Sequence, residues 1–291
     1  MGIRLSVLIP TYDYVEGLDR ILSSFLTDPS DEIEILISDD SHDEHVNHLV
    51  ADFSSQYLGK LDYRRNCPGL GAVVNWNSLL AQASGDYILL LHHDEYPLGD
   101  RFVWKVLEFL RKNSEVDVLV MNCILCTSTD LIGRPHLPKI IRSLVVKYYP
   151  SYLFRRNVIG PTSCLIVRRE LYPRFDECLR WLVDVEAYFR LRLKTERWRF
   201  CNSLKIGSAL GRNESITSSI KDELRQIDAS ERSYLRRKYP VAEVWLEPSA
   251  HWIINLLEFA LWGWMRIVTR MCFIFTHLYS LSKLYLQRKI K

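Results

Sequence analysis

The sequence lacks three features that would narrow its class at once. Its charge is nearly balanced, with 38 Lys and Arg against 35 Asp and Glu, so composition does not point to nucleic acid, and no nucleic-acid partner is expected. Its seven cysteines are an odd number scattered through apolar segments, which argues against a disulfide framework and favours a reducing compartment. The N-terminus enters the apolar segment Leu5–Pro10 without the basic, apolar and cleavage regions of an export signal.

What the sequence does contain is an alternation of strand-like and helix-like segments. Its 291 residues, 48% of them apolar, are enough for one large or two modest domains with a substantial core. Ile3–Ile9 and Ile33–Ser38 have the apolar pattern of strands, and Val15–Phe25 and Glu44–Phe53 have helical spacing. This β-α-β-α order predicts a parallel sheet with right-handed crossovers.

The chain is organised around a short apolar run, Tyr87–Leu91, that ends in the polar cluster His92–Glu95. An apolar run of this length after a glycine turn predicts a central strand buried on both faces. Two earlier strands also end in polar residues, Thr11–Asp13 and Asp39–Ser41. Because ligands of open α/β sheets bind at the carboxyl ends of the strands, these three ends predict one shared site.

The remaining segments complete an α/β pattern. Further elements are expected as a short strand at Leu61–Arg64, helices at Val73–Ala83, Asp100–Arg111 and Leu182–Leu193, a core strand at Val118–Leu125, loops and a mobile helix over the site at Pro135–Arg156, and a turn into a strand at Ile159–Arg169.

Four stretches, taken together, resemble a known family. They are Leu5–Tyr12 (LSVLIPTY), Ile37–Asp43 (ISDDSHD), Arg65–Asn77 and Gly85–Glu95 (GDYILLLHHDE). In this order and spacing they are similar to the nucleotide-sugar-binding half of family 2 glycosyltransferases with the GT-A fold. The resemblance implies a Rossmann-like, mostly parallel central sheet flanked by helices, and inverting transfer of a sugar from a nucleotide-diphosphate donor.

The resemblance also implies a set of donor-binding residues. Asp39 or Asp40 would accept hydrogen bonds from a uracil N–H or ribose hydroxyls, although Asp40 could instead cap the following helix. Arg65 would meet the diphosphate, and by composition Arg64 is an equal candidate. Gly71 would let the backbone approach the nucleotide. The set expected to bind the nucleotide sugar is Pro10, Thr11, Tyr12, Asp39, Asp40, Arg65, Gly71, Asn75, His93 and Arg212.

The cluster His92–Glu95 occupies the position of the family's DXD motif. Asp94 matches the metal-binding Asp, Glu95 matches the acidic residue that often follows, and His92 replaces the first Asp. The implied cofactor is a divalent cation, Mn²⁺ or Mg²⁺, held by Asp94, Glu95 and His92. Two alternatives remain open: His92 supports the ligands without binding the ion, and His93 lies on a solvated loop.

The second half carries the expected catalytic residue. Asp184 lies in the first turn of the helix expected at Leu182–Leu193, where the helix dipole alone would favour a carboxylate. The resemblance implies that Asp184 is the general base, followed by Glu186 and Arg190 at matching positions, while Val183 replaces the usual Glu. A later loop, Gly211–Thr217, resembles the one that closes over the nucleotide, with Arg212 in place of its His.

The C-terminal segment changes composition at Trp252. Within 252–291 the longest run without Lys, Arg, Asp or Glu is Met271–Ser282, shorter than the ~20 residues that a bilayer span needs. We expect a helical segment at 251–291 that lies in the membrane interface. A buried dimer-facing helix and a single tilted span are alternatives. The expected domains are 1–225, with a donor half 1–100 and an acceptor half 101–225, and a helical extension 226–291.

These expectations combine into one function. The chain is expected to transfer a sugar, from a UDP-sugar by preference, to a hydroxyl of a glycan or polyprenyl-linked acceptor, as in bacterial polysaccharide or O-antigen assembly. It would act in the cytoplasm at the inner face of the cell membrane, with a homo-oligomer possible. The alternative is a non-catalytic sugar-nucleotide-binding scaffold, motivated by His92 and Arg212. A nucleotidyltransferase is disfavoured because Pro10-Thr11-Tyr12 is not a glycine-rich phosphate loop.

Overall fold

The fold is seen in a computed structural model that describes residues 2–126, 134–135, 137–209 and 223–240. These residues belong to one compact unit, Met1–Glu243. Arg212, its loop Gly211–Thr217 and the segment 251–291 lie outside the described residues. No helix in the described ranges is both long enough and apolar enough to cross a membrane.

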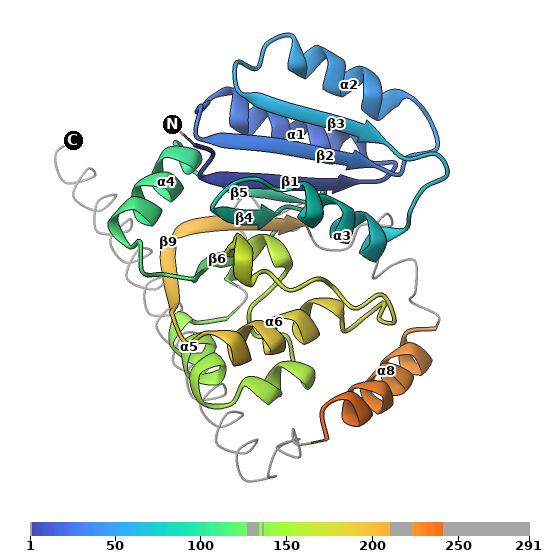
Figure 1. Cartoon of the computed structure of the whole chain (residues 1–291), viewed down its shortest axis with the longest axis vertical. Helices are drawn as coiled ribbons and strands as arrows, with labels where there is room; N and C mark the ends of the chain where they lie inside the picture. The colour runs from blue at the N-terminus through green and yellow to red at the C-terminus, as the bar shows by residue number, and fades with distance from the viewer. Residues whose placement is uncertain (1, 127–133, 136, 210–222, 241–291) are drawn as a thin grey trace, which may run out of the picture. The chain divides into compact units, whose positions relative to one another are not determined.

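A single mixed sheet runs through the unit, with its strands in the order β3-β2-β1-β4-β8-β6-β9-β5 and with β7 beside β6 (Figure 1). The first four neighbours pair in parallel: β3 (Lys60–Arg65), β2 (Ile33–Asp39), β1 (Leu5–Thr11) and β4 (Tyr87–Leu90). Beyond β4 the pairing is mixed. The remaining strands are β8 (Leu165–Arg168), β6 (Val118–Cys126), β9 (Trp198–Ala209), β5 (Glu95–Leu98) and β7 (Arg134–Pro135). Among them the pairs β4–β8, β8–β6, β9–β5 and β6–β7 are antiparallel, and the pair β6–β9 is parallel.

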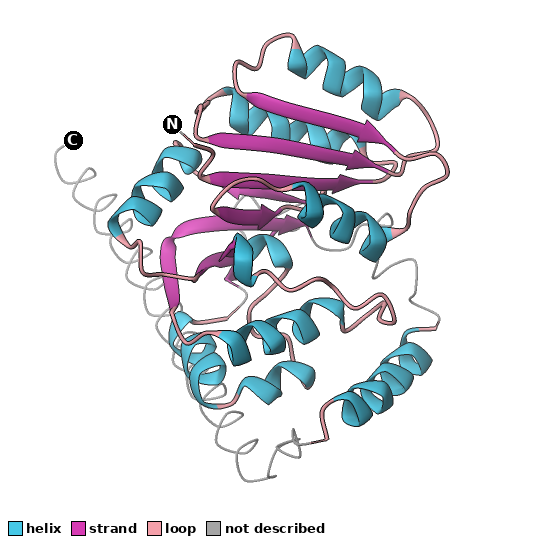
Figure 2. Ribbon diagram, in the orientation of Figure 1, coloured by secondary structure: helices cyan, strands magenta, loops and turns pink. Residues whose placement is uncertain are grey.

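Helices α1 to α4 lie against the sheet, whereas α8 lies away from the strands (Figure 2). In α1 (Val15–Leu26) the buried side chains Leu18, Ile21, Leu22 and Phe25 recur at helical intervals, and they join the core with strands β1, β2 and β4. Each such side chain contributes about 1.5–3 kcal/mol of burial free energy. The other helices are α2 (His45–Ser54), α3 (Ala72–Gln82), α4 (Phe102–Lys112), α5 (Lys139–Tyr148), α6 (Val183–Lys194) and α8 (Leu224–Lys238), with 3₁₀ turns η1 (Pro150–Phe154), η2 (Thr162–Cys164) and η3 (Arg169–Leu171).

One buried carboxylate joins the parallel strands. Glu34 of β2 accepts hydrogen bonds from Ser6 of β1, from both the N–H and the hydroxyl of Ser84, and from Lys60 of β3. Burial raises the pKa of Glu34, but these donors outweigh it and lower the pKa to about 2. The carboxylate is therefore ionised inside the sheet and holds the start of β4 against β1 and β2.

Tyr87–Leu91 is a buried central strand, as expected: β4 lies between β1 and β8 and its side chains are fully covered. Strands β5 and β9 were not predicted. The segment that forms β9 has no continuous apolar run, and β5 begins inside the polar cluster, at Glu95. These two strands pair with each other, and β9 also pairs with β6, so they carry the sheet into the second half of the chain.

Candidate active site

A cavity of about 1370 Å³ opens at the carboxyl ends of β1, β2 and β4. Its walls come from both halves of the chain, because the loops before α3 and α6 also reach it. Asp39 does not line the cavity, and Arg212 lies outside the described residues. The expected site residues that do line it are Pro10, Thr11, Tyr12, Asp40, Arg65, Gly71, Asn75, His92, His93, Asp94, Glu95 and Asp184.

The two aspartates at the end of β2 have different surroundings. Asp39 is fully buried and accepts hydrogen bonds from the N–H of Ser41 and the hydroxyl of Tyr63, each at 2.8 Å. Asp40 faces the cavity and accepts from the N–H groups of Leu70 and Gly71, at 3.1 and 2.9 Å. Asp39 therefore braces β2 against β3, while Asp40 shapes the loop at the cavity wall.

Asp40 does not cap the following helix, so that alternative is wrong. Helix α2 begins after Glu44, and the N–H of its first residue, His45, donates to the carboxylate of Asp43 at 3.0 Å and not to Asp40. The carboxylate of Asp40 points instead to the 66–71 loop, where it also accepts from the side-chain amide of Asn66 at 2.8 Å. The loop ends at Gly71, whose φ of 81° is a backbone conformation that residues with a Cβ rarely adopt.

Of the two candidate arginines, only Arg65 lines the cavity. Its guanidinium contacts the carboxylate of Glu44 and donates to the carbonyl of His42 at 2.9 Å. Arg64 donates to the side chain of Asn66 instead, at 3.0 Å. A diphosphate that used Arg65 would therefore compete with Glu44 for its donors.

His93 joins the ends of two strands. Its Nδ1 accepts a hydrogen bond from the backbone N–H of Tyr12 at 3.1 Å, and its ring meets the edge of Tyr14 at a centroid distance of 5.5 Å. Because Nδ1 accepts, the neutral ring carries its proton on Nε2. His93 lies half-buried in the turn between β4 and β5, and it holds the backbone of Tyr12, a residue that is 46% exposed.

The DXD-like cluster has the geometry of a cation site. One ligand atom from each of His92, Asp94 and Glu95 lies within 4.8 Å of the others. Glu95 is 4% exposed, and its Oε2 accepts no hydrogen bond within the described part of the chain. Burial, and then the charge of Asp94, raise the pKa of Glu95 well above its usual range. A buried carboxylate oxygen without a donor beside a second carboxylate fits a divalent cation.

His92 is suited to complete this cluster. Burial lowers its pKa to about 4, so at neutral pH its imidazole is uncharged and has a lone pair to offer. The ring stacks on Trp76 with centroids 4.7 Å apart, and its Nε2 lies 3.3 Å from the hydroxyl of Thr162. Its Nδ1 lies 3.7 Å from Oε2 of Glu95. Trp76 and Thr162 thus orient the ring, and both line the cavity although neither was predicted.

Asp184, the second residue of α6, lines the same cavity. Its Oδ1 accepts from the N–H of Val185 at 2.8 Å, and its Oδ2 accepts from the side-chain amide of Asn157 at 2.7 Å. Burial raises the pKa of Asp184 to about 6, against the opposing effect of these hydrogen bonds. A carboxylate with that pKa is ionised at neutral pH and is more basic than an exposed one.

The two residues that accompany Asp184 in the family pattern do not line the cavity. Glu186 is fully buried and accepts from Arg190 at 2.7 Å, from Lys238 at 2.7 Å and from the hydroxyl of Tyr239 at 2.5 Å. These contacts hold α6 and α8 together, so Glu186 and Arg190 have a structural role here.

Asn157 was missed by sequence reasoning. It lies in a turn where its Oδ1 accepts from the N–H groups of Ile159 and Gly160, and its Nδ2 donates to the carbonyl of Gly160. The available signal was the sequence Asn157-Val158-Ile159-Gly160, an asparagine followed by a glycine with φ of 105°. The wall on this side also contains Arg155, Arg156, Arg180, Trp181 and Arg232.

A family model described as "Glycosyl transferase family 2" matches residues 6–174 of the chain. The abequosyltransferase RfbV of Salmonella typhimurium is 30% identical over 203 residues, which are 67% of this chain and 54% of RfbV. The UDP-Glc:alpha-D-GlcNAc-diphosphoundecaprenol beta-1,3-glucosyltransferase WfgD of Escherichia coli is 22% identical over 173 residues, 58% of this chain and 66% of WfgD. The chain spans about half the length of the first curated relatives it matches, 52% and 54%.

Among solved structures, residues 1–349 of S. aureus TarS in complex with UDP-GlcNAc superpose with a TM-score of 0.58. The sequences are 18% identical, and the match covers 74% of this chain and 61% of the TarS chain. At this identity the likeness establishes a shared fold. It agrees with the GT-A architecture expected from the first hundred residues.

Proposed function

The chain belongs to glycosyl transferase family 2, and from that premise we propose that it transfers a sugar from a UDP-sugar to a hydroxyl group of a glycan or lipid-linked acceptor, with inversion at the anomeric carbon. The observation that supports the proposal is that two groups line one cavity. They are the cluster of His92, Asp94 and Glu95, and Asp184 with a pKa of about 6.

The donor's nucleotide is proposed to bind along the ends of β1 and β2. The exposed ring of Tyr12 offers a stacking surface, and Asp40 offers an acceptor for a base N–H or ribose hydroxyls. Arg65 would neutralise phosphate charge. Arg212, outside the described residues, is proposed to add a second cation. Support for UDP comes from TarS, which is seen with UDP-GlcNAc, and from WfgD, whose name gives UDP-Glc as donor.

His92, Asp94 and Glu95 would hold a divalent cation, Mn²⁺ or Mg²⁺. When bound, this ion would neutralise charge on the diphosphate leaving group. Of the two ions, Mn²⁺ accepts an imidazole ligand more readily, and burial keeps the ring of His92 neutral for that role. Trp76 and Thr162 hold the ring in place, which limits the reorganisation needed on binding.

Asp184 is proposed to remove the proton from the acceptor hydroxyl as that oxygen attacks the anomeric carbon. Oδ2 keeps the hydrogen bond from Asn157, which stabilises the ionised carboxylate before the proton moves. A single displacement with a base on the face opposite the leaving group inverts the configuration. The raised pKa suits the task, because a base is most effective when its pKa lies near the working pH.

The acceptor is proposed to be a lipid-linked glycan, and the segment 251–291 is proposed to bring the protein to the inner face of the cell membrane. WfgD supports this, since its name gives a diphosphoundecaprenol acceptor. The chain's own aromatic and basic C-terminal composition is the second argument. Self-association through the same segment is the competing proposal, and comparing vesicle flotation with sedimentation in the absence of lipid distinguishes them.

The function is tested with the purified full chain, a panel of UDP-sugars, an acceptor lipid extract and Mn²⁺, with release of UDP as the signal. We expect UDP release that a chelator abolishes, and we expect Asp184→Asn to lower it about 100- to 10,000-fold. Binding of UDP by calorimetry should stay within about twofold, and Asp19→Asn, an exposed carboxylate on α1, is the matched control. Loss of UDP binding in Asp184→Asn would give that residue a structural role.

A further inference from the structure

Helix α8 supplies a buried carboxylate to the loop that leads into α6, the helix of Asp184. Glu231 is 5% exposed, and its two oxygens accept from the backbone N–H groups of Arg180, Trp181 and Leu182 at distances of 2.6 to 3.2 Å. Leu182 is the N-cap residue that directly precedes α6, and its own side chain makes no capping hydrogen bond. Asp184 accepts from one open N–H of the first turn, that of Val185, while the N–H of Leu182 is satisfied from another helix, 49 residues further along the chain.

The neighbouring residue of α8 holds the other segment beside Asp184. The guanidinium of Arg232 contacts the backbone carbonyl of Phe154 and is itself held by Asp228 at 2.7 Å. Phe154 lies three residues before Asn157, the hydrogen-bond donor to Asp184. Glu231 and Arg232, adjacent on α8, therefore hold the two chain segments next to the carboxylate of Asp184: the loop that leads into α6 and the segment that leads to Asn157.

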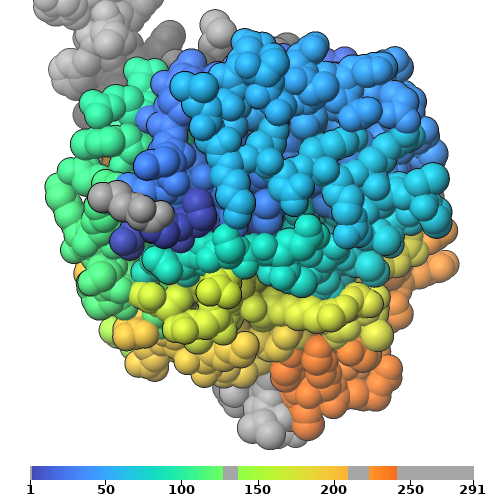
Figure 3. Space-filling view, turned by 45° about the horizontal axis from the view of Figure 1, so that its top comes forward, coloured from blue at the N-terminus to red at the C-terminus, as the bar shows by residue number. Residues whose placement is uncertain are grey.

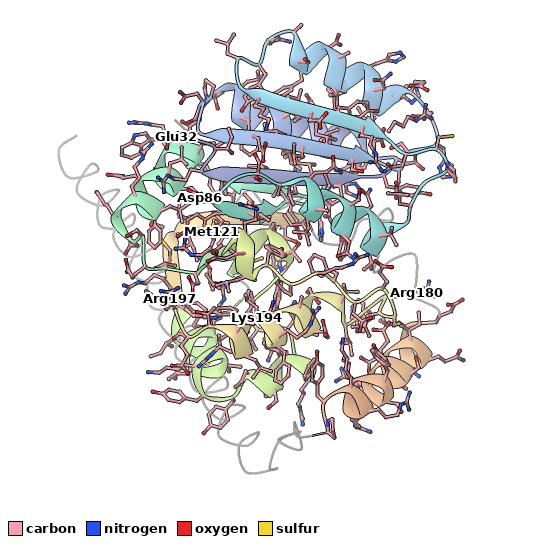
Figure 4. All side chains as sticks on the ribbon, in the orientation of Figure 1. Glu32, Asp86, Met121, Arg180, Lys194 and Arg197 are labelled. Carbon is pink, nitrogen blue, oxygen red and sulfur yellow. The ribbon has the colours of Figure 1, made fainter. Side chains whose placement is uncertain are left out.

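The C-terminal end of α8 is bonded to α6, the helix that carries Asp184. Lys238 bonds to Glu186 of α6 at 2.7 Å and to Asp176 at 2.6 Å, and the hydroxyl of Tyr239 also bonds to Glu186. In Figure 3 the orange atoms of α8 lie directly against the yellow segment that precedes α6. Figure 4 shows Arg180 at the tip of that segment, next to α8. The helix is thus fixed along α6 and is not a free extension.

We infer that Glu231 is a positioning residue for the transfer reaction: it holds the 180–182 loop so that Asp184 faces the acceptor hydroxyl. This inference rests on the proposed role of Asp184. The reason is geometric, since Leu182 and Asp184 are only two residues apart and no described side chain other than Glu231 is bonded to the N–H groups of that loop. A shift of about 1 Å in a reacting group is enough to lower a rate about 100-fold.

The alternative is that Glu231 contributes only to folding. That role predicts a smaller amount of native protein, so that transfer rate and the number of UDP-binding sites fall in the same proportion at every pH. A positioning role predicts a different pattern, because the donor site at the ends of β1 and β2 does not involve α8. UDP binding would then persist while turnover falls.

The pH profile provides a second readout. Loosening the loop admits water to Asp184, which moves its pKa down from about 6 toward the value of an exposed carboxylate. The groups facing Asp184 are Asn157 and the N–H of Val185, with Tyr188 of the same helix near enough that the charge of Asp184 helps to raise the pKa of that phenol. Removing the negative charge of Glu231 also lowers the pKa of Asp184, as hydration does.

The test compares Glu231→Ala, Glu231→Gln and, as the matched control on α8, Ser233→Ala, whose hydroxyl bonds only to the exposed Arg237 among the contacts described. We expect Glu231→Ala to lower kcat about 100-fold with UDP affinity and the donor KM unchanged within about twofold. Glu231→Gln keeps one accepting oxygen, so its kcat should lie between those of the wild type and Glu231→Ala. The acid limb of kcat/KM should move below pH 6, and hydrogen exchange should increase at 180–182.

Three results decide the matter. Wild-type turnover in Glu231→Ala, or a rate that falls only with the number of UDP-binding sites, overturns the positioning role and leaves the proposed function standing. Absence of UDP release by the wild-type protein with every donor overturns both. If Glu231→Ala loses turnover but still binds UDP and unfolds cooperatively, and its acid limb is shifted, the result supports the role of Glu231.

Discussion

Asn157 donates a hydrogen bond from its side-chain nitrogen to Oδ2 of Asp184 at 2.7 Å. The same nitrogen donates to the carbonyl of Gly160 at 2.9 Å, and the amide oxygen accepts from the N–H groups of Ile159 and Gly160. Both ends of the amide are thus fixed by the turn. The amide therefore has one fixed orientation, with an N–H directed at Asp184, and this orients the carboxylate that is proposed to act as the base.

Replacing Asn157 by Ala removes a donor that stabilises the ionised form of Asp184. We expect kcat to fall about 10- to 100-fold, with UDP affinity unchanged. The pKa of Asp184 should rise further, because a hydrogen bond to the charged form lowers it, so the acid limb should move above pH 6. Asn113→Ala, at the end of α4, is the control. An acid limb that stays in place would show that Asn157 does not act on Asp184.

The wild-type rate should depend on pH through Asp184. Because the reactive form is the carboxylate, kcat/KM should rise with pH and reach half of its maximum near pH 6. Rates of UDP release between pH 4 and 9 at saturating Mn²⁺ measure this limb. A midpoint near 4, the ordinary value for Asp, would contradict the raised pKa.

The same shift makes a prediction about stability. A carboxyl group whose pKa is raised on folding stabilises the fold below its unfolded value of 3.8, and that contribution is lost as the pH rises through about 6. Asp184→Asn should therefore be more stable than the wild type at pH 7, on the order of 1 kcal/mol, and equally stable near pH 3.5. Urea unfolding at both pH values measures the difference. Lower stability of Asp184→Asn at pH 7 would be the contrary outcome.

The cation cluster can be tested without turnover. Binding of Mn²⁺ to the protein without donor can be measured from the electron paramagnetic resonance signal of free Mn²⁺. This binding should be lost in Asp94→Ala and weakened about 10- to 100-fold in His92→Ala. His48→Ala, an exposed histidine on α2, should bind as the wild type does. Undiminished Mn²⁺ binding by Asp94→Ala would remove the cluster from the mechanism.

Glu34→Gln tests the fold apart from the site. The substitution removes an ionised acceptor from the donors of Ser6, Ser84 and Lys60, and we expect a loss of about 1–3 kcal/mol in unfolding free energy at pH 7. Because the folded pKa is depressed to about 2, this stability is present above the unfolded value of 4.5 and disappears as the pH falls through 2. Glu16→Gln on α1 is the control. An equal loss at pH 2.5 and pH 7 would contradict the linkage.

Local patterns were sufficient for the first half of the fold. Apolar runs and helical spacing placed β1, β2, β4 and α1, since burial against a neighbouring layer imposes a period that can be read without knowing the neighbour. They also brought the polar ends of those strands to one sheet edge, where the cavity lies. Long-range pairing decided β5 and β9, whose sequences have no strong period because each is only partly buried.

The sequence by itself determined the family, the parallel half of the sheet, and two groups that line the same cavity, the His92–Glu95 cluster and Asp184. Only the tertiary structure decided that Asp40 and not Asp39 lines the cavity, that Asn157 bonds to Asp184, and that Glu231 bonds to the loop before α6. The physical reason is distance along the chain. A motif records which side chains stand together locally, whereas a hydrogen bond spanning 27 or 49 residues exists only after the sheet and helices have packed.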